Sequence, residues 1–141
     1  MRVLGLDIGT KYIGMAITDE TGSIAQPFAS YTRQGLKKDL LFFDNFVKKH
    51  NIKKIIVGYP LNMDDTENEM SIFVKNFYNK IKKRWQIPVI LWDERLTTEQ
   101  AENALRESNK VKFIKRKELK DKVAASLILA SYINGTDGNG S

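Results

Sequence analysis

Three carboxylate residues stand out in a chain that lacks most other catalytic groups. Asp7 lies inside an otherwise apolar run, Glu94 follows a second apolar run, and Asp121 lies near the start of a predicted helix. The chain has no cysteine and one histidine, His50, which we expect on the surface at the end of a helix. Thiol nucleophiles, thiolate or His-rich metal sites and paired-histidine catalysis are therefore excluded, and a Ser-His-Asp triad is disfavoured. If the protein is an enzyme, carboxylates are the groups that would do its chemistry.

The sequence around Asp7 favours a functional role for its carboxylate. Burying an acid within a strand is costly unless a cation or hydrogen-bond donors receive it. Gly9 and Thr10 follow, and glycine lets a backbone approach a phosphate or an ion closely. The alternative is an aspartate that only caps the turn after the strand. We expect catalysis from Asp7 and substrate contacts from Thr10 and Lys11.

A second acidic cluster, Asp93–Arg95, comes directly after a predicted strand that ends at Trp92. Open α/β sheets bind ligands at this carboxyl end of their parallel strands. Because successive strand residues alternate faces, Asp93 and Glu94 are not expected to point into one site together. We favour Glu94 as the ligand and Asp93 as a supporting group, with the reverse assignment left open. We expect Arg95 to contact substrate by clamping a phosphate bidentately; the alternative is that it pairs with a neighbouring carboxylate and stiffens the loop.

The third acid, Asp121, shares one face of its predicted helix with Ala124, Ala125 and Ile128. The two alanines would let this helix lie close to the sheet and bring Asp121 towards Asp7. Alternatively, Asp121 only interacts favourably with the helix dipole. Three carboxylates without a histidine resemble a magnesium site, because Mg²⁺ takes oxygen ligands and bridges to phosphate. Such ions promote phosphodiester hydrolysis, and Mn²⁺ is the alternative metal.

Basic residues are concentrated in one stretch rather than spread evenly along the chain. The protein carries 23 basic and 17 acidic residues, a formal net charge of +6. Residues 110–122 alone hold seven basic and two acidic residues, a net charge of +5, and include Lys115 and Arg116. A focused basic patch favours a polyanionic partner such as nucleic acid. The alternative is an ordinary solvated, lysine-rich start of a helix.

The elements that must position these residues can be predicted from hydrophobic periodicity. Its 141 residues suit a single domain over 1–134, followed by a flexible tail over 135–141. The element order βββαβαβαα predicts an α/β fold with a mixed five-stranded sheet flanked by helices, with Pro27 near a sheet edge. No apolar run approaches the roughly 20 residues of a membrane span. Strands are expected over 3–8, 12–18, 23–31, 54–58 and 89–92, and helices over 36–47, 69–85, 97–107 and 115–133.

Four short motifs, in order along the chain, carry a family resemblance. The chain resembles the YqgF family, also called RuvX, of the ribonuclease H-like superfamily. The match covers nearly the whole chain up to about Ile133, and any single motif would be weak on its own. The motifs are Asp7–Lys11 with Tyr12–Ala16, Gly58–Asp64, Asp93–Thr98 and Asp121–Ala125.

The resemblance implies a ribonuclease H-like fold, a metal-dependent endonuclease and a cytoplasmic setting. The family is described as a nuclease for the 5′ end of pre-16S ribosomal RNA, with a ribosomal precursor particle as its partner, and earlier as a Holliday junction resolvase. Its acidic positions carry over to Asp7, Glu94 and Asp121. Asn62, in the middle motif, is a substrate-contact candidate together with Lys115 and Arg116. Asp65 departs from the glycine expected in that loop, and aspartate tolerates the left-handed backbone better than most residues.

Two other classes of protein share some of these features. The Asp7–Thr10 segment also resembles the phosphate loop of the actin and sugar-kinase superfamily, but those proteins close two such domains over a nucleotide. Nucleotide binding would identify that class. A non-catalytic nucleic-acid-binding module would share the basic patch, because electrostatic attraction binds DNA or RNA without cleaving it. The sequence does not decide between structured RNA and branched DNA as the partner.

Overall fold

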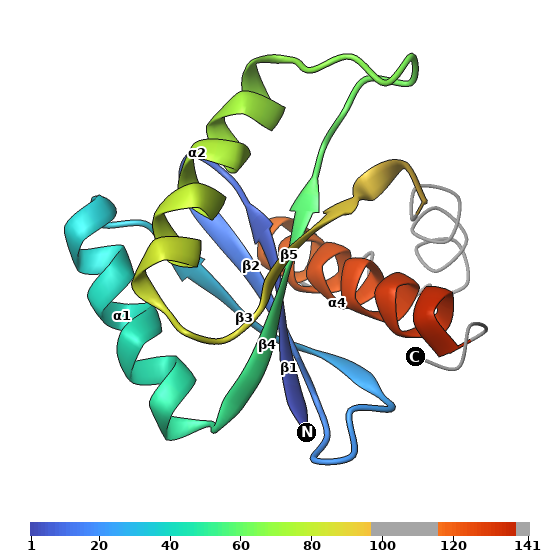
Figure 1. Ribbon diagram of the computed structural model, residues 1–141. Coiled ribbons are helices and arrows are strands. Elements are labelled where there is room, and N and C mark those ends of the chain that lie inside the picture. The colour runs from blue at the N-terminus through green and yellow to red at the C-terminus, as the bar shows by residue number, and fades with distance from the viewer. Residues whose placement is uncertain (97–115, 138–141) are drawn as a thin grey trace.

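The computed structural model describes residues 1–96 and 116–137 (Figure 1). The predicted helix over 97–107 and the basic residues 110–115 lie outside these ranges. The strands are β1 (Arg2–Ile8), β2 (Tyr12–Thr18), β3 (Ala25–Thr32), β4 (Ile52–Tyr59) and β5 (Val89–Asp93). The helices are α1 (Leu36–Lys49), α2 (Glu69–Arg84) and α4 (Arg116–Asp137), with a short 3₁₀ helix, η1, over Glu94–Leu96.

The five strands form one mixed sheet in the order β3-β2-β1-β4-β5. The pairs β1–β2 and β2–β3 are antiparallel, which suits the short connections between these strands. The pairs β1–β4 and β4–β5 are parallel, and the chain reaches β4 and β5 through α1 and α2. The predicted mixed five-stranded sheet is therefore confirmed, and Pro27 lies on β3, at a sheet edge where a missing N–H donor is tolerated.

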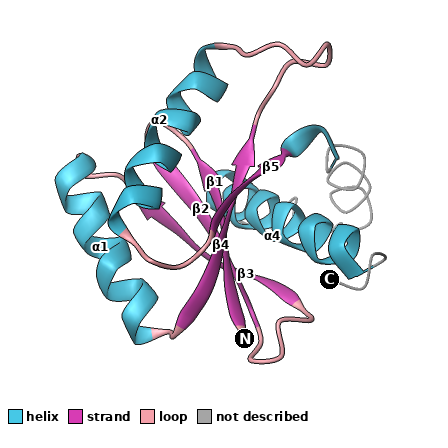
Figure 2. Ribbon diagram, in the orientation of Figure 1, coloured by secondary structure: helices cyan, strands magenta, loops and turns pink. Residues whose placement is uncertain are grey.

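Helices cover both faces of the sheet, α1 and α2 on one face and α4 on the other (Figures 1 and 2). Alternation along β1 divides its side chains between the two layers. Leu4, Leu6 and Ile8 join the larger core cluster beneath α1 and α2. Val3 joins the smaller cluster beneath α4, and Gly5 and Asp7 share its side of the strand. The carboxylate of Asp7 therefore belongs to the face that α4 covers.

A glycine on β1 allows α4 to lie close to the sheet. A Cβ atom built on Gly5 would come within 2.9 Å of Leu129 Cβ and 3.1 Å of the Ala125 carbonyl oxygen. Ala125 is fully buried and Ala124 is half-buried. The expected close approach of this helix is present, and it depends on Gly5 as much as on the alanines.

The last helix extends beyond its expected end. We expected a helix over 115–133 and a flexible tail from 135, whereas α4 continues to Asp137. Trp92 of β5 explains the extra turn, because its Nε1 donates to Ser131 Oγ at 3.1 Å and its ring lies beside Gly135. This contact fixes the end of α4 on the sheet edge that carries the β5 acids.

On the opposite face, Asp44 connects α1 to α2. Its carboxylate accepts hydrogen bonds from Arg84 Nε at 2.7 Å and Trp85 Nε1 at 2.6 Å. The pKa of Asp44 is lowered, chiefly by Arg84. His50, expected on the surface, is instead half-buried against the Phe46 ring, with the centroids 4.2 Å apart. Burial, followed by the charges of nearby basic residues, lowers the pKa of His50 and keeps the ring neutral.

Candidate active site

The carboxyl ends of β1, β4 and β5 meet at one edge of the sheet. Leu6 of β1 pairs with Val57 of β4, so Asp7, the next-to-last residue of β1, lies next to Gly58. Gly58 in turn pairs with Trp92 of β5, and Glu94 follows two residues later. The topology therefore brings Asp7 and Glu94 together across β4, although they are far apart in the sequence.

Gly58 provides the space in which Glu94 lies. A Cβ atom built on Gly58 would approach Glu94 Cγ at 3.0 Å and Ile128 Cδ1 at 2.6 Å, and it would collide with the Glu94 carboxylate. Any larger residue would therefore push the Glu94 side chain away from β4. Glycine within an apolar strand is a sequence signal of close approach, and it could have identified this position in advance.

Replacing Gly58 with alanine tests this packing directly. We expect Gly58→Ala to lower the rate of any metal-dependent reaction at the site by at least about tenfold, because the Glu94 carboxylate is displaced. Gly135→Ala is the matched control, since its new methyl would also meet a neighbour, the Trp92 ring at 3.1 Å. Reaction rates and melting temperatures would be measured for both variants. Equal rates in the two variants would mean that the space above Gly58 does not matter to the site.

Asp7 and Glu94 are two acids whose side chains share a small, partly buried space, and this affects their ionisation. Burial, followed by the charge of Asp7 and a hydrogen bond with it, raises the pKa of Glu94 to about 8. The charge of Asp93 contributes in the same direction. At neutral pH one proton therefore lies between the two carboxyl groups, in a position that a cation could take instead.

Asp93 points to a different partner. Its carboxylate accepts from the Arg95 backbone N–H and from Arg95 Nε, both at 3.0 Å. Hydrogen bonds from Arg95 are the main cause that lowers the pKa of Asp93. Glu94 rather than Asp93 thus lies beside Asp7. That Glu94 is the metal ligand stays a prediction.

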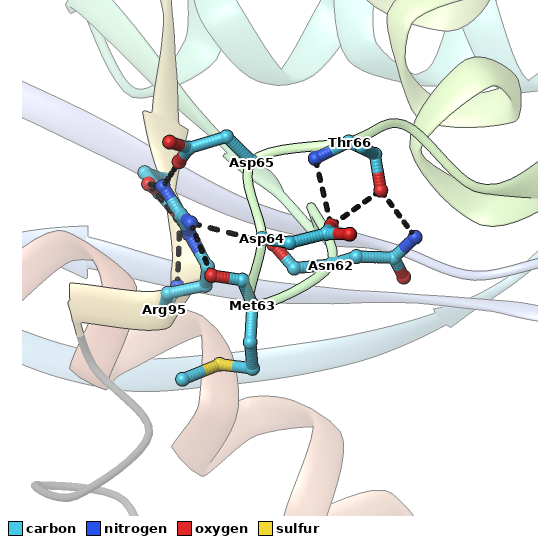
Figure 3. A network of polar contacts seen from close by, with 7 residues as sticks. Asn62, Met63, Asp64, Asp65, Thr66 and Arg95 are labelled. Carbon is cyan, nitrogen blue, oxygen red and sulfur yellow. Dashed lines mark hydrogen bonds and ion pairs between the residues drawn. The ribbon is translucent and has the colours of Figure 1, made fainter.

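Arg95 holds the loop between β4 and α2 (Figure 3). Its Nη1 group donates to the carbonyl oxygens of Asn62 at 3.3 Å and Met63 at 3.2 Å. Its Nη2 group forms ion pairs with Asp93 and Asp65, and its Nε also binds Asp93. All five N–H donors of the guanidinium therefore have protein acceptors. Of the two interpretations of Arg95 given above, the structure shows the loop-stiffening one.

The loop held by Arg95 contains the residue that departs from the family pattern. Asp65 adopts a φ of 72°, the left-handed region in which aspartate is among the tolerated residues. Its carboxylate pairs with Arg95, so the acid adds a contact to the turn. Asn62 closes the same loop, because its Nδ2 donates to Thr66 Oγ1 at 2.9 Å and its Oδ1 accepts from Asn68.

The structure describes some of the other substrate-contact candidates but not all of them. Thr10 and Lys11 are exposed in the short loop between β1 and β2, next to Asp7. Lys115 lies outside the described residues. Arg116 begins α4 and Asp121 lies in its second turn, but their side chains fall outside the described part of the chain.

The arrangement of strands and helices matches that of proteins solved with Holliday junctions. Thermus thermophilus RuvC, solved in complex with a Holliday junction substrate, matches 96% of this chain and 96% of its own, with 13% identity and a TM-score of 0.63. The fowlpox virus resolvase, solved with Holliday junction DNA, matches 96% of this chain and 99% of its own, with 16% identity and a TM-score of 0.61. At these identities the likeness establishes the fold, the ribonuclease H-like fold of RuvC-type resolvases.

Sequence comparison identifies the family within that class. The family model described as "RuvX: Holliday junction resolvase" matches residues 1–135. A relative from Thermoanaerobacter pseudethanolicus, named "Putative pre-16S rRNA nuclease", is 42% identical over 134 residues, covering 95% of this chain and 96% of its own. A relative of the same name from Endomicrobium trichonymphae is 44% identical over 133 residues, covering 94% of this chain and 95% of its own. The chain belongs to the RuvX family, and the predicted resemblance is confirmed.

Proposed function

We propose that this protein is a metal-dependent endonuclease in which Asp7, Glu94 and Asp121 hold the metal. Membership of the RuvX family makes it a nuclease, a hydrolase acting on phosphodiester bonds. The single observation that supports the proposed site best is the meeting of Asp7 and Glu94 beside Gly58. Two acids whose carboxylates share one buried space repel each other when both are ionised, and a bound cation would relieve that repulsion.

The chemistry of the donor set fits a hard divalent cation. Both side chains offer oxygen atoms, which Mg²⁺ and Mn²⁺ prefer, and the raised pKa of Glu94 means that a cation would replace a proton. Among the side chains that the structure describes, which do not include that of Asp121, no cluster of three ligating groups is found. We assign the third position to Asp121, because α4 lies on the face of the sheet that carries Asp7.

We assign the following binding roles to residues of this chain. Asp7, Glu94 and Asp121 bind the ion, while Thr10 and Lys11 contact the phosphate from the loop after β1. Lys115 and Arg116, within the basic stretch, bind the nucleic-acid backbone. A bound divalent ion would activate the attacking water and stabilise the leaving oxygen of the phosphodiester.

The substrate we favour is the 5′ end of pre-16S ribosomal RNA, within a ribosomal precursor particle in the cytoplasm. The names of the relatives that match nearly the full chain support this choice. Branched DNA is the second candidate, favoured by the RuvX family description and by the likeness to resolvases solved with Holliday junctions. None of the helices in the described ranges is long and apolar enough to cross a membrane.

A cleavage assay tests the proposal. The purified protein would be incubated in Mg²⁺ or Mn²⁺ with a labelled 5′ precursor segment of 16S rRNA and with a labelled four-way DNA junction. We expect cleavage of the RNA that stops when the metal is chelated, and a preference for the junction would instead favour the DNA role. Binding of both without cleavage of either, in every metal, would contradict the nuclease proposal and favour the non-catalytic module.

The Asp65–Arg95 pair predicts how the loop after β4 responds to nucleic acid. A phosphate can reach Arg95 only by replacing Asp65, because the other acceptors of Arg95 belong to Asp93 and the loop backbone. We expect Asp65→Asn to tighten RNA binding about three- to tenfold, since it removes the competing charge while asparagine keeps the left-handed turn. Binding would be measured by fluorescence anisotropy in the presence of a chelator.

Glu67→Gln is the matched control for this variant. It removes one acid from the same loop, but Glu67 pairs with Tyr59 and Lys75 rather than with Arg95. We expect it to change the RNA dissociation constant less than about twofold. If the two variants tightened binding equally, the effect of Asp65 would be one of net charge only and Arg95 would have no part in it.

A further inference from the structure

Arg33, directly after β3, fixes the loop that follows Asp7. Its Nη1 donates to the carbonyl oxygen of Gly9 at 3.2 Å, and its backbone N–H donates to the carbonyl oxygen of Lys11 at 2.8 Å. The Gly9 N–H donates in turn to the Tyr12 carbonyl oxygen at 2.8 Å. Both ends of the Gly9–Lys11 segment are therefore tied down, one of them by a side chain from a distant part of the sequence.

Arg33 is itself held by a buried acid. Asp39 of α1 accepts from Arg33 Nε at 2.9 Å, from the Tyr31 hydroxyl at 2.7 Å and from the Gln34 backbone N–H at 2.9 Å. Burial opposes ionisation of Asp39, but these hydrogen bonds lower its pKa overall. The guanidinium carbon of Arg33 also lies 5.3 Å from the ring centroids of Phe73 and Phe77.

The Arg33–Asp39 ion pair is much more buried than the pair between Arg84 and Asp44. The Arg33 and Asp39 side chains are 12% and 0% exposed, whereas those of the Arg84–Asp44 pair are 38% and 24% exposed. A buried ion pair contributes little net stability compared with apolar residues of similar size, because both charges lose their hydration. Its effect is instead to give the guanidinium a single orientation, which is the one that points Nη1 at the Gly9 carbonyl.

Fixing the Gly9 carbonyl also fixes the next amide group. The peptide bonds of the described residues are trans, so the Gly9 C=O and the Thr10 N–H point in opposite directions from one rigid plane. With the carbonyl turned towards Arg33, the Thr10 N–H points away from Arg33. Thr10 is exposed and lies three residues after Asp7. A backbone N–H held in this manner is a preorganised donor for an anionic oxygen.

We propose that Arg33, held by Asp39, is a positioning residue that orients the Thr10 N–H to bind a phosphate of the nucleic acid beside Asp7 and Glu94. The inference rests on the proposed nuclease function for the identity of the ligand. The orientation itself follows from the contacts of Arg33 and does not depend on catalysis.

Arg33→Lys tests the inference, with Arg84→Lys as the matched control. Lysine keeps the positive charge but lacks the planar fork that serves Asp39 and Gly9 together. We expect Arg33→Lys to raise KM for the RNA substrate about five- to tenfold and to change kcat less than about threefold. Loss of folded protein alone would lower the apparent kcat and leave KM unchanged. Arg84→Lys is expected to leave both constants unchanged.

Amide NMR gives a second readout that does not need turnover. In ¹⁵N-labelled wild-type protein without metal, a short oligouridylate is expected to shift the Thr10 amide resonance, and Arg33→Lys is expected to weaken that shift several-fold. If Arg33→Lys does not fold, Asp39→Asn is measured in the same way, since it releases Arg33 from its anchor. An unresponsive Thr10 amide in the wild type, or equal responses in Arg33→Lys and Arg84→Lys, would overturn the inference.

The two measurements separate this inference from the proposed function. Wild-type protein that shifts its Thr10 amide with RNA but cleaves no substrate would contradict the nuclease proposal and leave the positioning by Arg33 supported. Wild-type protein that cleaves, beside an Arg33→Lys variant with unchanged KM, would support the nuclease and overturn the positioning.

Discussion

Asp7→Asn is expected to abolish cleavage while leaving the fold intact. Asparagine has nearly the same shape as aspartate but carries no charge, so it is a poor ligand for Mg²⁺. We expect the cleavage rate to fall by roughly a thousandfold or more, because the proposed site would no longer hold the ion that would activate the water. The melting temperature is expected to hold or rise, since the variant removes the charge that faces Glu94.

Asp44→Asn gives the opposite pattern and serves as the control. Asp44 lies on the other face of the sheet, where it accepts from Arg84 and Trp85. We expect this variant to lose about 1–2 kcal/mol of stability and to retain wild-type cleavage per folded molecule. Cleavage rates would be measured under single-turnover conditions, with melting temperatures from circular dichroism. Wild-type cleavage by Asp7→Asn would remove Asp7 from the active site.

Glu94→Gln is expected to be more stable than the wild type at high pH without metal, and inactive. Unfolded Glu94 loses its proton near its ordinary pKa of 4.5, whereas the folded side chain keeps the proton up to about pH 8. Between these values the unfolded state binds fewer protons, so the free energy of unfolding of the wild type falls as pH rises. Glutamine cannot titrate, so this part of the pH dependence disappears in the variant.

The size of the effect is large enough to measure by thermal unfolding. A raised pKa of this size corresponds to a few kcal/mol of unfolding free energy at most. Glu94→Gln should therefore melt roughly 5–10 °C above the wild type at pH 8.5, and at the same temperature as the wild type at pH 4. Adding Mg²⁺ at pH 8.5 should raise the melting temperature of the wild type but not of the variant. Parallel melting curves across the pH range, with equal responses to Mg²⁺, would contradict the proximity of the two acids.

The sequence was sufficient to predict the five strands and the helices α1 and α2, and it singled out Asp7 and Glu94 as candidates for the site. Periodicity is local, so the strands and the helices α1 and α2 could be predicted from consecutive residues, and Asp7 stood out as a carboxylate in an apolar strand. Strand alternation indicated that Asp93 and Glu94 would not point into one site together, and it left open which of them lies beside Asp7. The pairing of Asp7 with Glu94 also needed the order β1-β4-β5, which follows from parallel crossovers.

The remaining features of the site depend on tertiary contacts that leave no local pattern. Asp65 and Arg95 are thirty positions apart, and nothing near Arg95 shows that its five donors are already used. The contact of Arg33 with Gly9 joins two residues that are 24 positions apart in the sequence and lie just after two different strands. The sequence therefore favoured a phosphate contact for Arg95 and did not single out Arg33, the residue whose side chain contacts the Gly9 carbonyl oxygen.

A diffraction experiment on crystals soaked in Mn²⁺ tests the central claim most directly. Manganese scatters anomalously, so its position can be located without reference to any activity. We predict a strong anomalous peak bound by the carboxylates of Asp7 and Glu94, with oxygen distances of roughly 2.1–2.2 Å and octahedral geometry. The peak should vanish in crystals of Asp7→Asn. A fully occupied Mn²⁺ elsewhere, with Asp7 and Glu94 still joined by a proton, would contradict the assignment of these two acids as the metal site.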